Sequence, residues 1–411
     1  MWRSFQVGSI FGIPLKLDLT FLLILPLLAW IIGVQIEPVV LLLNEIWAAG
    51  IDVDSLTTSP TRWLLGLAAA IGLFLGVLLH ELGHSLVARR YGLPIESITL
   101  WIFGGIARMS ELPEDWRKEL NIAIAGPIVS VLVGVAAYLG FLVTPDIAAA
   151  LGMQTTTGVD AALFVFGYLA VLNVALALFN VLPAFPMDGG RILRAVLSRN
   201  RPYVEATSIA AEIGKGFAIL FGIFGLFQLN IILIGIAFFV YIAASGEAQQ
   251  VAIRAAFRGV LVRDVMTPAD RLRTVTPETT VEELTRRMFE ERHTGYPVLE
   301  NSHPVGMVTL EDAKGVRDAE RAAFQVGEVM SEELVTVGPD DEVIDALEQL
   351  QTNAVGRLLV MEGDELVGLL SRTDLMHAFD VVQSTGADLG RGARRPGSAE
   401  TERSERFQRP R

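Results

Sequence analysis

The chain of 411 residues contains no cysteine. Disulfide bonds and thiolate ligands to zinc are therefore excluded, which leaves His, Asp and Glu as candidate metal ligands. Histidine is itself scarce, with five residues in the whole chain. Basic residues are fewer than acidic ones: the chain has 33 Lys and Arg and 46 Asp and Glu, which gives a net charge of −13. This acidic balance argues against nucleic acid as a direct partner.

Charged residues are sparse in the first 250 positions and concentrated after them. Hydrophobic residues make up 52% of the chain and the mean hydropathy is +0.47, as in a multispanning membrane protein. We therefore expect an α-helical membrane domain at 1–250 and a soluble α/β domain at 251–383. The segment 384–411 is rich in Gly, Arg, Ser, Glu and Pro, and it is predicted to be a disordered tail.

The first half contains about six apolar segments that can cross a bilayer as helices. They lie at 19–34, 63–87, 122–143, 161–182, 216–229 and 231–244. The first segment is expected to be a retained span rather than a removable signal, because no small-residue cleavage pattern follows it.

The positive-inside rule gives these spans an orientation. Eleven Lys and Arg lie in the segments 1–16, 89–121 and 183–212, whereas the segments 35–60 and 144–160 contain none. Both termini, and with them the soluble half, are therefore predicted to be cytoplasmic.

Residues His80, Glu81 and His84 spell HELGH inside an otherwise apolar stretch. Ionisable side chains are costly in hydrocarbon, so their presence indicates a functional site. Positions i and i+4 of a helix share a face, so both imidazoles can bind one Zn²⁺. Glu81 projects about 100° away from His80. It is therefore free to act as the general base on a water whose pKa the metal has lowered.

Two histidines do not complete a hydrolytic zinc site, which needs a third protein ligand and an open position for water. The segment 180–190, NVLPAFPMDGG, ends the fourth apolar stretch. Its two prolines prevent the helix from continuing and its two glycines permit a tight turn, so Asp188 is expected on irregular backbone near the membrane boundary. We predict Asp188 as the third ligand. The alternative is a polar loop acid just outside the bilayer.

The segment 93–109, LPIESITLWIFGGIARM, is rich in β-branched and aromatic residues and is interrupted by Gly104 and Gly105. This pattern predicts a β-hairpin or a re-entrant segment. Non-helical backbone is tolerated at membrane depth only where other parts of the protein or a water-filled cavity supply hydrogen bonds to its N–H and C=O groups. The alternative is an ordinary amphipathic loop.

The sequence GVLLHELGH at 76–84, followed by NVLPAFPMDGG at 180–190, resembles the site-2 protease family of intramembrane zinc metalloproteases. That resemblance implies that His80, His84 and Asp188 bind zinc and that Glu81 is the catalytic base. It also implies that Asn180 contacts the substrate or the developing oxyanion. The hairpin containing Gly104 and Gly105 would pair with an unwound substrate.

Two positions depart from the pattern of the family. Members with a similar N-terminal phrase often have histidine where this chain has Asp18. The Gly126-Pro127 motif of the family often continues to an asparagine where this chain has Ser130. The auxiliary roles of these two positions stay open. Asp18 is interpreted as an interfacial acid.

From position 261 onward the chain repeats itself in two copies, at about 261–318 and 325–381. Gly306 of the first copy recurs as Gly368 of the second, and a period of about 62 residues indicates two copies of one supersecondary unit. Each copy is predicted to contain a strand, a helix, two strands and a second helix. These copies are similar to a tandem pair of CBS domains.

The similarity to CBS domains implies a ligand. Thr309 with Asp312, and Ser371 with Asp374, match the [ST]xxD pairs with which that family binds ribose and phosphate. The implied ligand is an adenine nucleotide (ATP, ADP or AMP), and a homodimer through these domains is a further expectation. The alternative is that the four residues are helix N-caps, for which Thr, Ser and Asp are preferred.

Together these features predict a zinc metalloprotease that cleaves a peptide bond in or near the membrane-spanning helix of a single-pass protein. The substrate has to unwind before attack, because peptide groups in a lipid-exposed helix are already hydrogen-bonded. Pairing with the Gly104 hairpin would hold it extended. Adenine nucleotide on the CBS pair would regulate cleavage. The alternatives are a CBS-gated ion channel or transporter, in which the intramembrane His and Asp line an ion path, and a metal-free scaffold.

Overall fold

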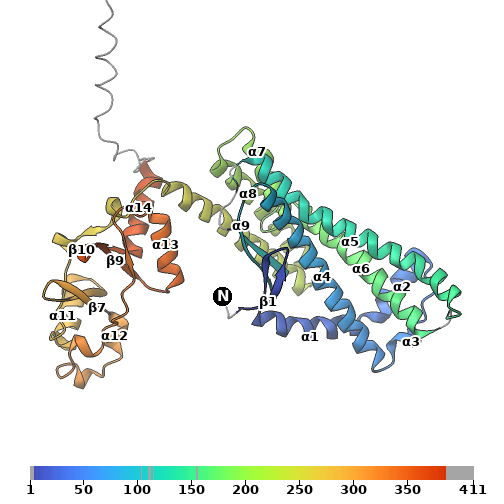
Figure 1. Cartoon of the computed structure of the whole chain (residues 1–411), viewed down its shortest axis with the longest axis horizontal. Helices are drawn as coiled ribbons and strands as arrows, with labels where there is room; N and C mark the ends of the chain where they lie inside the picture. The colour runs from blue at the N-terminus through green and yellow to red at the C-terminus, as the bar shows by residue number, and fades with distance from the viewer. Residues whose placement is uncertain (1–3, 103, 110–112, 114, 154–155, 386–411) are drawn as a thin grey trace, which may run out of the picture. The chain divides into compact units, whose positions relative to one another are not determined.

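The computed structural model describes residues 4–385 except 103, 110–112, 114 and 154–155. From residue 386 onward, the predicted disordered tail lies outside the described residues. The chain divides into two compact units, Met1–Gln249 and Gln250–Arg411. Figure 1 shows a helical first unit and a mixed α/β second unit, which confirms the predicted fold class.

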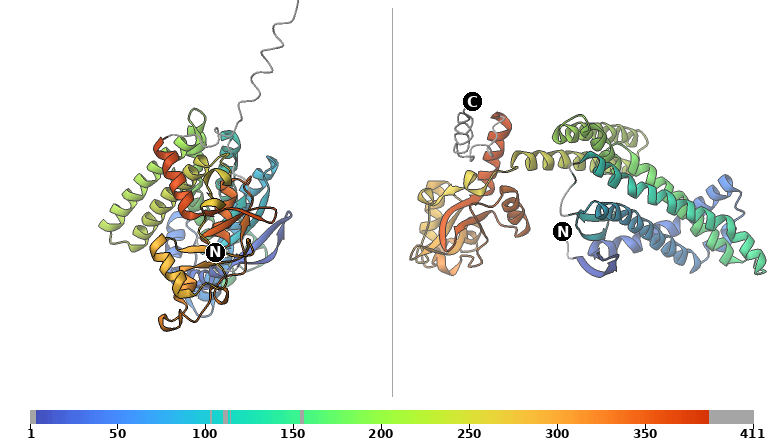
Figure 2. Two further views of the ribbon diagram at one scale, coloured as in Figure 1. Left: turned by 90° about the vertical axis from the view of Figure 1, so that its left-hand side faces the viewer. Right: turned by 45° about the horizontal axis from the view of Figure 1, so that its top comes forward.

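Five helices of the first unit are long and apolar enough to cross a membrane. They are α4 (Thr61–Arg90), α5 (Trp116–Ala150), α6 (Thr157–Val181), α8 (Tyr203–Phe227) and α9 (Ile231–Ala256). Taken together, α1 (Leu19–Val34) and α2 (Ile36–Trp47) are also long and apolar enough to cross a membrane, with a bend of 60° between them. The prediction of about six spans is therefore confirmed. The views in Figure 2 show α5 and α6 side by side.

Helix α2 was not predicted, because its 12 residues are too few for a span. Its buried positions Ile36, Val40 and Leu43 recur with helical spacing and pack in one core cluster with residues of α4 and α6. The short helix α3 (Val53–Thr57) follows, and its Leu56 is buried in the same cluster.

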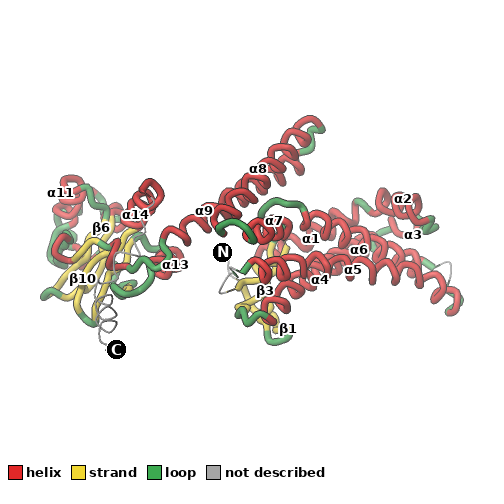
Figure 3. The backbone as a smooth tube through the Cα atoms, turned by 90° about the horizontal axis from the view of Figure 1, so that it is seen from above, coloured by secondary structure: helices red, strands yellow, loops and turns green. Residues whose placement is uncertain are grey.

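A four-stranded sheet lies beside the last turns of α4 (Figure 3). Its strands β1 (Ser4–Ile10), β2 (Ile13–Asp18), β3 (Ile95–Trp101) and β4 (Gly104–Met109) occur in that order, with β4 at one edge. β3 and β4 form an antiparallel pair in which Leu100 faces Gly105. The predicted hairpin is thus confirmed. β2 runs parallel to β3, so the N-terminal pair, which was not predicted, extends that hairpin.

The helix α7 (Asp188–Ser198) lies between the spans α6 and α8. It is 11 residues long and packs against α5 and α8. Its first residue is the predicted metal ligand.

The second unit contains the two predicted repeats. Its helices are α10 (Val262–Val265), α11 (Val281–Glu291), α12 (Leu310–Lys314), α13 (Val343–Thr352) and α14 (Arg372–Thr385). Its strands are β5 (Thr267–Pro268), β6 (Gly295–Glu300), β7 (His303–Thr309), β8 (Thr336–Val337), β9 (Arg357–Glu362) and β10 (Glu365–Ser371). Three single turns of 3₁₀ helix complete it, at Ala269–Arg271, Asp318–Glu320 and Val326–Glu328.

The two repeats exchange their opening segments. β5 of the first copy pairs with β10 of the second, in the sheet order β5-β10-β9-β8. Conversely, Ser331 at the opening of the second copy bridges to Met307 on β7 of the first. Each copy therefore completes the sheet of the other.

Candidate metal centre

Three side chains far apart in the sequence meet at one buried point. His80 and His84 lie one turn apart on α4, and Asp188 begins α7. The Nε2 atoms of the two histidines are 3.2 Å apart, and each lies 3.1 Å from Oδ2 of Asp188. All three residues are buried, with 7% exposure at most. Among the described residues, these are the only three His, Cys, Asp or Glu whose ligand atoms are close enough to hold one metal ion.

The spacing of these atoms fits zinc. Ligands at about 2.0–2.1 Å in tetrahedral geometry are separated by about 3.3 Å, which is close to the three distances in the cluster. Gly126 on α5 leaves the necessary room, since a Cβ there would lie 2.2 Å from Nε2 of His84 and 2.7 Å from that of His80. Two imidazoles and one carboxylate, without a thiolate, are also a donor set typical of catalytic zinc.

Both imidazoles are oriented by hydrogen bonds from their other ring nitrogen. Nδ1 of His80 lies 2.8 Å from Oγ of Ser130, and Nδ1 of His84 lies 2.6 Å from the carbonyl oxygen of Ile122. If each Nδ1 carries the proton, both Nε2 atoms are left as acceptors that point at the shared site. Ser130 has no exposed surface. The role that the sequence left open for Ser130 is therefore to orient His80.

Replacing Ser130 with alanine is expected to weaken zinc binding by about ten- to hundredfold, because the tautomer and ring angle of His80 are no longer fixed. Competition with a chelator at fixed free zinc measures this. The matched control is Ser245→Ala, whose hydroxyl donates to Tyr241 of its own helix and which should bind zinc as the native chain does. Equal affinities in the two variants would contradict the role of Ser130.

Asp188 reaches the site because α6 ends at Val181 and irregular backbone follows as far as Met187. The prediction that Asp188 itself lies on irregular backbone is wrong by one position, since Met187 is the N-cap and Asp188 is the first residue of α7. The Oδ2 atom of Asp188 faces Nε2 of both histidines. As a metal ligand this carboxylate must be ionised.

Glu81 contacts the hairpin. Its Oε2 accepts a hydrogen bond of 3.2 Å from the backbone N–H of Ala107 on β4. A Cβ at Gly105 would lie 2.5 Å from Cγ of Glu81, so only glycine lets the strand approach this closely. Gly104 opens the strand with a φ of 125°, which also favours glycine. The structure thus brings Gly104, Gly105 and the predicted base together.

Two other candidate residues, Asn180 and Asp18, form hydrogen bonds within or at the end of a helix. The amide of Asn180 donates to the carbonyl oxygen of Leu176 on its own helix at 3.0 Å. Within the described residues, no hydrogen bond joins Asn180 to the three-residue cluster, so its substrate role stays a prediction. Asp18 caps α1, because its Oδ1 accepts from the backbone N–H and hydroxyl of Thr20.

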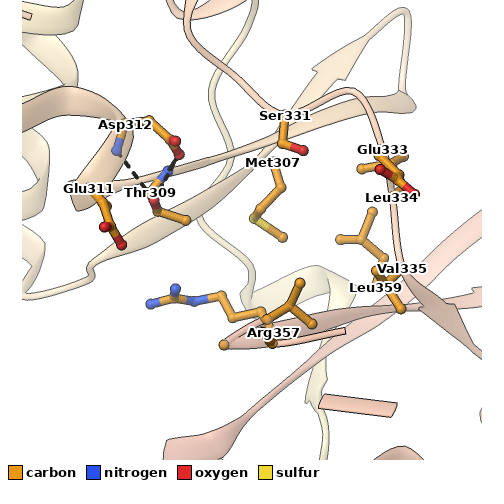
Figure 4. Close-up of a pocket in the computed structure, with 13 residues that line it drawn as sticks. Met307, Thr309, Glu311, Asp312, Ser331, Glu333, Leu334, Val335, Arg357 and Leu359 are labelled. Carbon is orange, nitrogen blue, oxygen red and sulfur yellow. Dashed lines mark hydrogen bonds between the residues drawn. The ribbon is translucent and has the colours of Figure 1, made fainter. Parts of the chain in front are cut away.

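In the second unit, both [ST]xxD pairs are helix caps. Thr309 and Asp312 form a reciprocal capping box on α12, and Ser371 and Asp374 form the same bonds on α14. The predicted cap alternative is therefore observed. Thr309 and Asp312 are more than cap residues, because both also line a cavity of about 260 Å³ (Figure 4).

Both repeats contribute to this cavity. Figure 4 shows Thr309 and Asp312 on one side, with Ser331 and Arg357 of the second copy nearby. Burial lowers the pKa of Arg357, and the charge of Asp374 partly offsets that effect. The lining of the cavity combines two hydroxyls, three carboxylates and one arginine.

Comparisons with known proteins agree with this architecture. The model of Peptidase family M50 matches residues 68–221, and the CBS domain model matches residues 262–316 and 326–381. The chain is 35% identical over 381 residues to zinc metalloprotease MJ0392 of Methanocaldococcus jannaschii, an alignment that covers 92% of this chain and 97% of that protein.

Two solved structures are also similar to parts of the chain. The site-2 protease of Methanocaldococcus jannaschii is 37% identical and covers 60% of this chain and 95% of its own, with a TM-score of 0.37. The crystal structure of CBSX2 in complex with AMP is 26% identical and covers 30% of this chain and 98% of its own, with a TM-score of 0.27. The near full-length relationship to MJ0392 and the buried His80, His84 and Asp188 cluster show that this chain belongs to peptidase family M50, as a multi-pass site-2 zinc metalloprotease with a tandem pair of CBS domains.

Proposed function

We propose that this protein cleaves a peptide bond in or next to the membrane-spanning helix of a single-pass membrane protein. The observation that carries the proposal is the buried His80, His84 and Asp188 cluster, two of whose members lie on the membrane helix α4. Zinc bound there would lower the pKa of a water molecule and polarise the scissile carbonyl. Both termini are proposed to lie in the cytoplasm, on the basis of the distribution of Lys and Arg.

Glu81 performs the proton transfers in this proposal. It follows His80 directly on α4, and its carboxylate accepts a hydrogen bond from the backbone N–H of Ala107. It takes the proton of the attacking water and delivers it to the leaving amine. Asn180 is proposed to hold the oxyanion, which requires its amide to leave the carbonyl of Leu176.

The outer edge of β4, the last strand in the sheet order, is the proposed docking site for the unwound substrate. In an antiparallel pair, successive N–H groups point alternately toward the partner strand and away from it. The N–H of Ala107 is bonded to Glu81, so it points away from β3. A substrate strand added along this edge would therefore lie beside the catalytic base, and its pairing with β4 requires the N–H of Ala107 to leave Glu81. Backbone pairing of this kind also supplies the hydrogen bonds that an unwound helix has lost.

Replacing Ala107 with proline is expected to raise KM at least about tenfold. Proline removes the outward N–H, and an edge strand tolerates it at such a position. The chain should keep its zinc. Steady-state cleavage of a membrane-anchored test peptide measures the effect. The control Ala107→Ser keeps the N–H and should retain the native KM. An unchanged KM in Ala107→Pro would contradict docking on β4.

Reconstitution into liposomes tests the proposed function as a whole. The purified chain, loaded with zinc, is mixed with single-pass peptides labelled on both sides of the membrane segment. We expect fragments whose new ends lie in or beside that segment, and no release of entrapped metal ions. Metal flux without cleavage would overturn the proposal in favour of transport.

We also infer that an adenine nucleotide binds the cavity between the repeats and regulates cleavage. The capping bonds of Asp312 use its Oδ2, and no hydrogen bond within the described residues occupies its Oδ1. That oxygen can accept from a ribose hydroxyl, while Arg357 offers charged donors to phosphate. In the second copy, Oδ1 of Asp374 already has Thr267 as a partner at 3.5 Å. We therefore expect the Asp312 cavity to be the main site, and a homodimer through the CBS domains remains part of the proposal.

Replacing Arg357 with methionine is expected to weaken ATP and ADP binding about tenfold or more but to leave adenosine binding unchanged. Calorimetric titration of the full chain in detergent measures both. The control Arg287→Met removes a half-buried arginine that pairs with Glu283 on α11 and should bind all three ligands as the native chain does. An equal loss of adenosine affinity would show that Arg357 does not contact phosphate.

A further inference from the structure

A buried arginine lies next to the backbone that carries the third metal ligand. Arg194 is on α7, six residues after Asp188, and its side chain has 2% exposure. Its guanidinium bonds to one oxygen of Glu119 on α5 at 2.6 and 2.7 Å. It bonds to Glu247 on α9 at 2.6 Å. Three helices are thus joined by one guanidinium.

The same guanidinium also contacts a side chain of the irregular segment that precedes Asp188. It lies 5.0 Å from the centre of the Phe185 ring and 4.8 Å from that of Tyr203. Phe185 precedes Asp188 by three residues, and Arg194 follows it on the same short helix. The guanidinium therefore connects the helix that Asp188 begins with the segment that precedes it.

Stability alone does not account for this group. Burying ionised side chains carries a desolvation cost that well-packed apolar residues avoid. Here two carboxylates share one guanidinium, and Oε2 of Glu119 is buried with no hydrogen bond among the described residues. The arrangement does fix orientation, because the planar, forked guanidinium sets the angles at which the carboxylates bind to it.

We infer that Arg194 is a positioning residue for Asp188, and that its ion pair with Glu247 makes the position of this ligand depend on α9. The two carboxylates differ in accessibility, since the Glu119 side chain is 6% exposed and that of Glu247 is 28% exposed. Glu119 is accordingly the fixed anchor. Glu247 is the adjustable partner, on the helix through which the chain continues into the second unit. The inference rests on the metal site and not on the identity of the substrate.

The rate at which zinc leaves the protein tests this inference without relying on proteolysis. Zinc-loaded variants in detergent are mixed with excess chelator, and zinc release is followed with time. We expect Glu247→Ala to release zinc about tenfold faster, and Glu247→Gln, which keeps a hydrogen bond, to lie between it and the native chain. Arg194→Met is not used, because it leaves the buried carboxylate of Glu119 unpaired and is expected to unfold.

The matched control is Glu205→Ala, which removes an exposed glutamate on α8 that pairs with Arg201. It should release zinc at the native rate. For the test peptide, Glu247→Ala should lower kcat and leave KM unchanged, since the β4 edge is intact. Native zinc release in Glu247→Ala, or equally faster release in Glu205→Ala, would overturn the inference. Loss of cleavage in every protein, including the native chain, would refute the proposed function but would leave the zinc result meaningful.

Discussion

Replacing Gly126 with alanine is expected to remove zinc from the protein and to abolish proteolysis, although the change adds a single methyl group. The new Cβ would lie 2.2 Å from Nε2 of His84, a separation that real Cβ atoms do not show. Neither imidazole can retreat, because Ser130 and Ile122 hold their other nitrogens from the same helix. Zinc content per chain, measured by mass spectrometry of the purified protein, should fall close to zero.

The control for this substitution is Gly235→Ala on α9. A Cβ there meets nothing within 4 Å, so the same chemical change in another membrane helix should leave zinc and cleavage intact. A Gly126→Ala protein that retains one zinc per chain and native kcat would show that the space beside Gly126 does not belong to the metal site.

Replacing Glu81 with glutamine is expected to lower kcat by about 10²–10⁴, the usual contribution of a general base. Zinc should stay bound, because the cluster of ligands does not include Glu81. The amide oxygen can still accept the hydrogen bond from Ala107, so the contact with β4 is kept. Single-turnover cleavage of the test peptide, together with zinc content, separates lost chemistry from a lost site.

An inactive variant that still docks its substrate can also identify that substrate. Glu81→Gln expressed in native membranes should co-purify with membrane-anchored proteins that the native chain releases as fragments. The control is Glu45→Gln, on the exposed surface of α2, which should cleave normally and retain no such proteins. Undiminished proteolysis by Glu81→Gln would refute the role of Glu81 as the base.

Much of the membrane unit could be predicted from composition, because a helix in hydrocarbon needs a long apolar run. Such a run marked the positions of α4, α5 and α6. The N-terminal strands were not predicted. Apolar and polar residues alternate in β1 only over a short run, Ser4–Val7, and nearly all its side chains are exposed, so the run does not mark a buried face. Their place follows instead from the pairing of β2 with β3, a contact between distant parts of the chain.

The metal ligands could be predicted because their spacing and backbone context are themselves chemical signals. The roles of Ser130 and Gly126 could not, since they arise only when α5 packs against α4. The sequence showed a serine where an asparagine was expected, and a hydroxyl accepts a hydrogen bond from an imidazole as an amide oxygen does. Nor could spacing along the chain indicate that Arg194 meets Glu119 and Glu247, because three separate helices supply them.

The exchange of opening segments between the CBS repeats means that neither repeat is a complete folding unit. A fragment that ended after the first copy would lose the strand partner of β5, and one that began at the second would leave β10 with an open edge. Unpaired edges of this kind recruit other chains. In evolutionary terms, a single ancestral copy would have needed a second molecule of itself, and duplication within one chain would have made that association permanent.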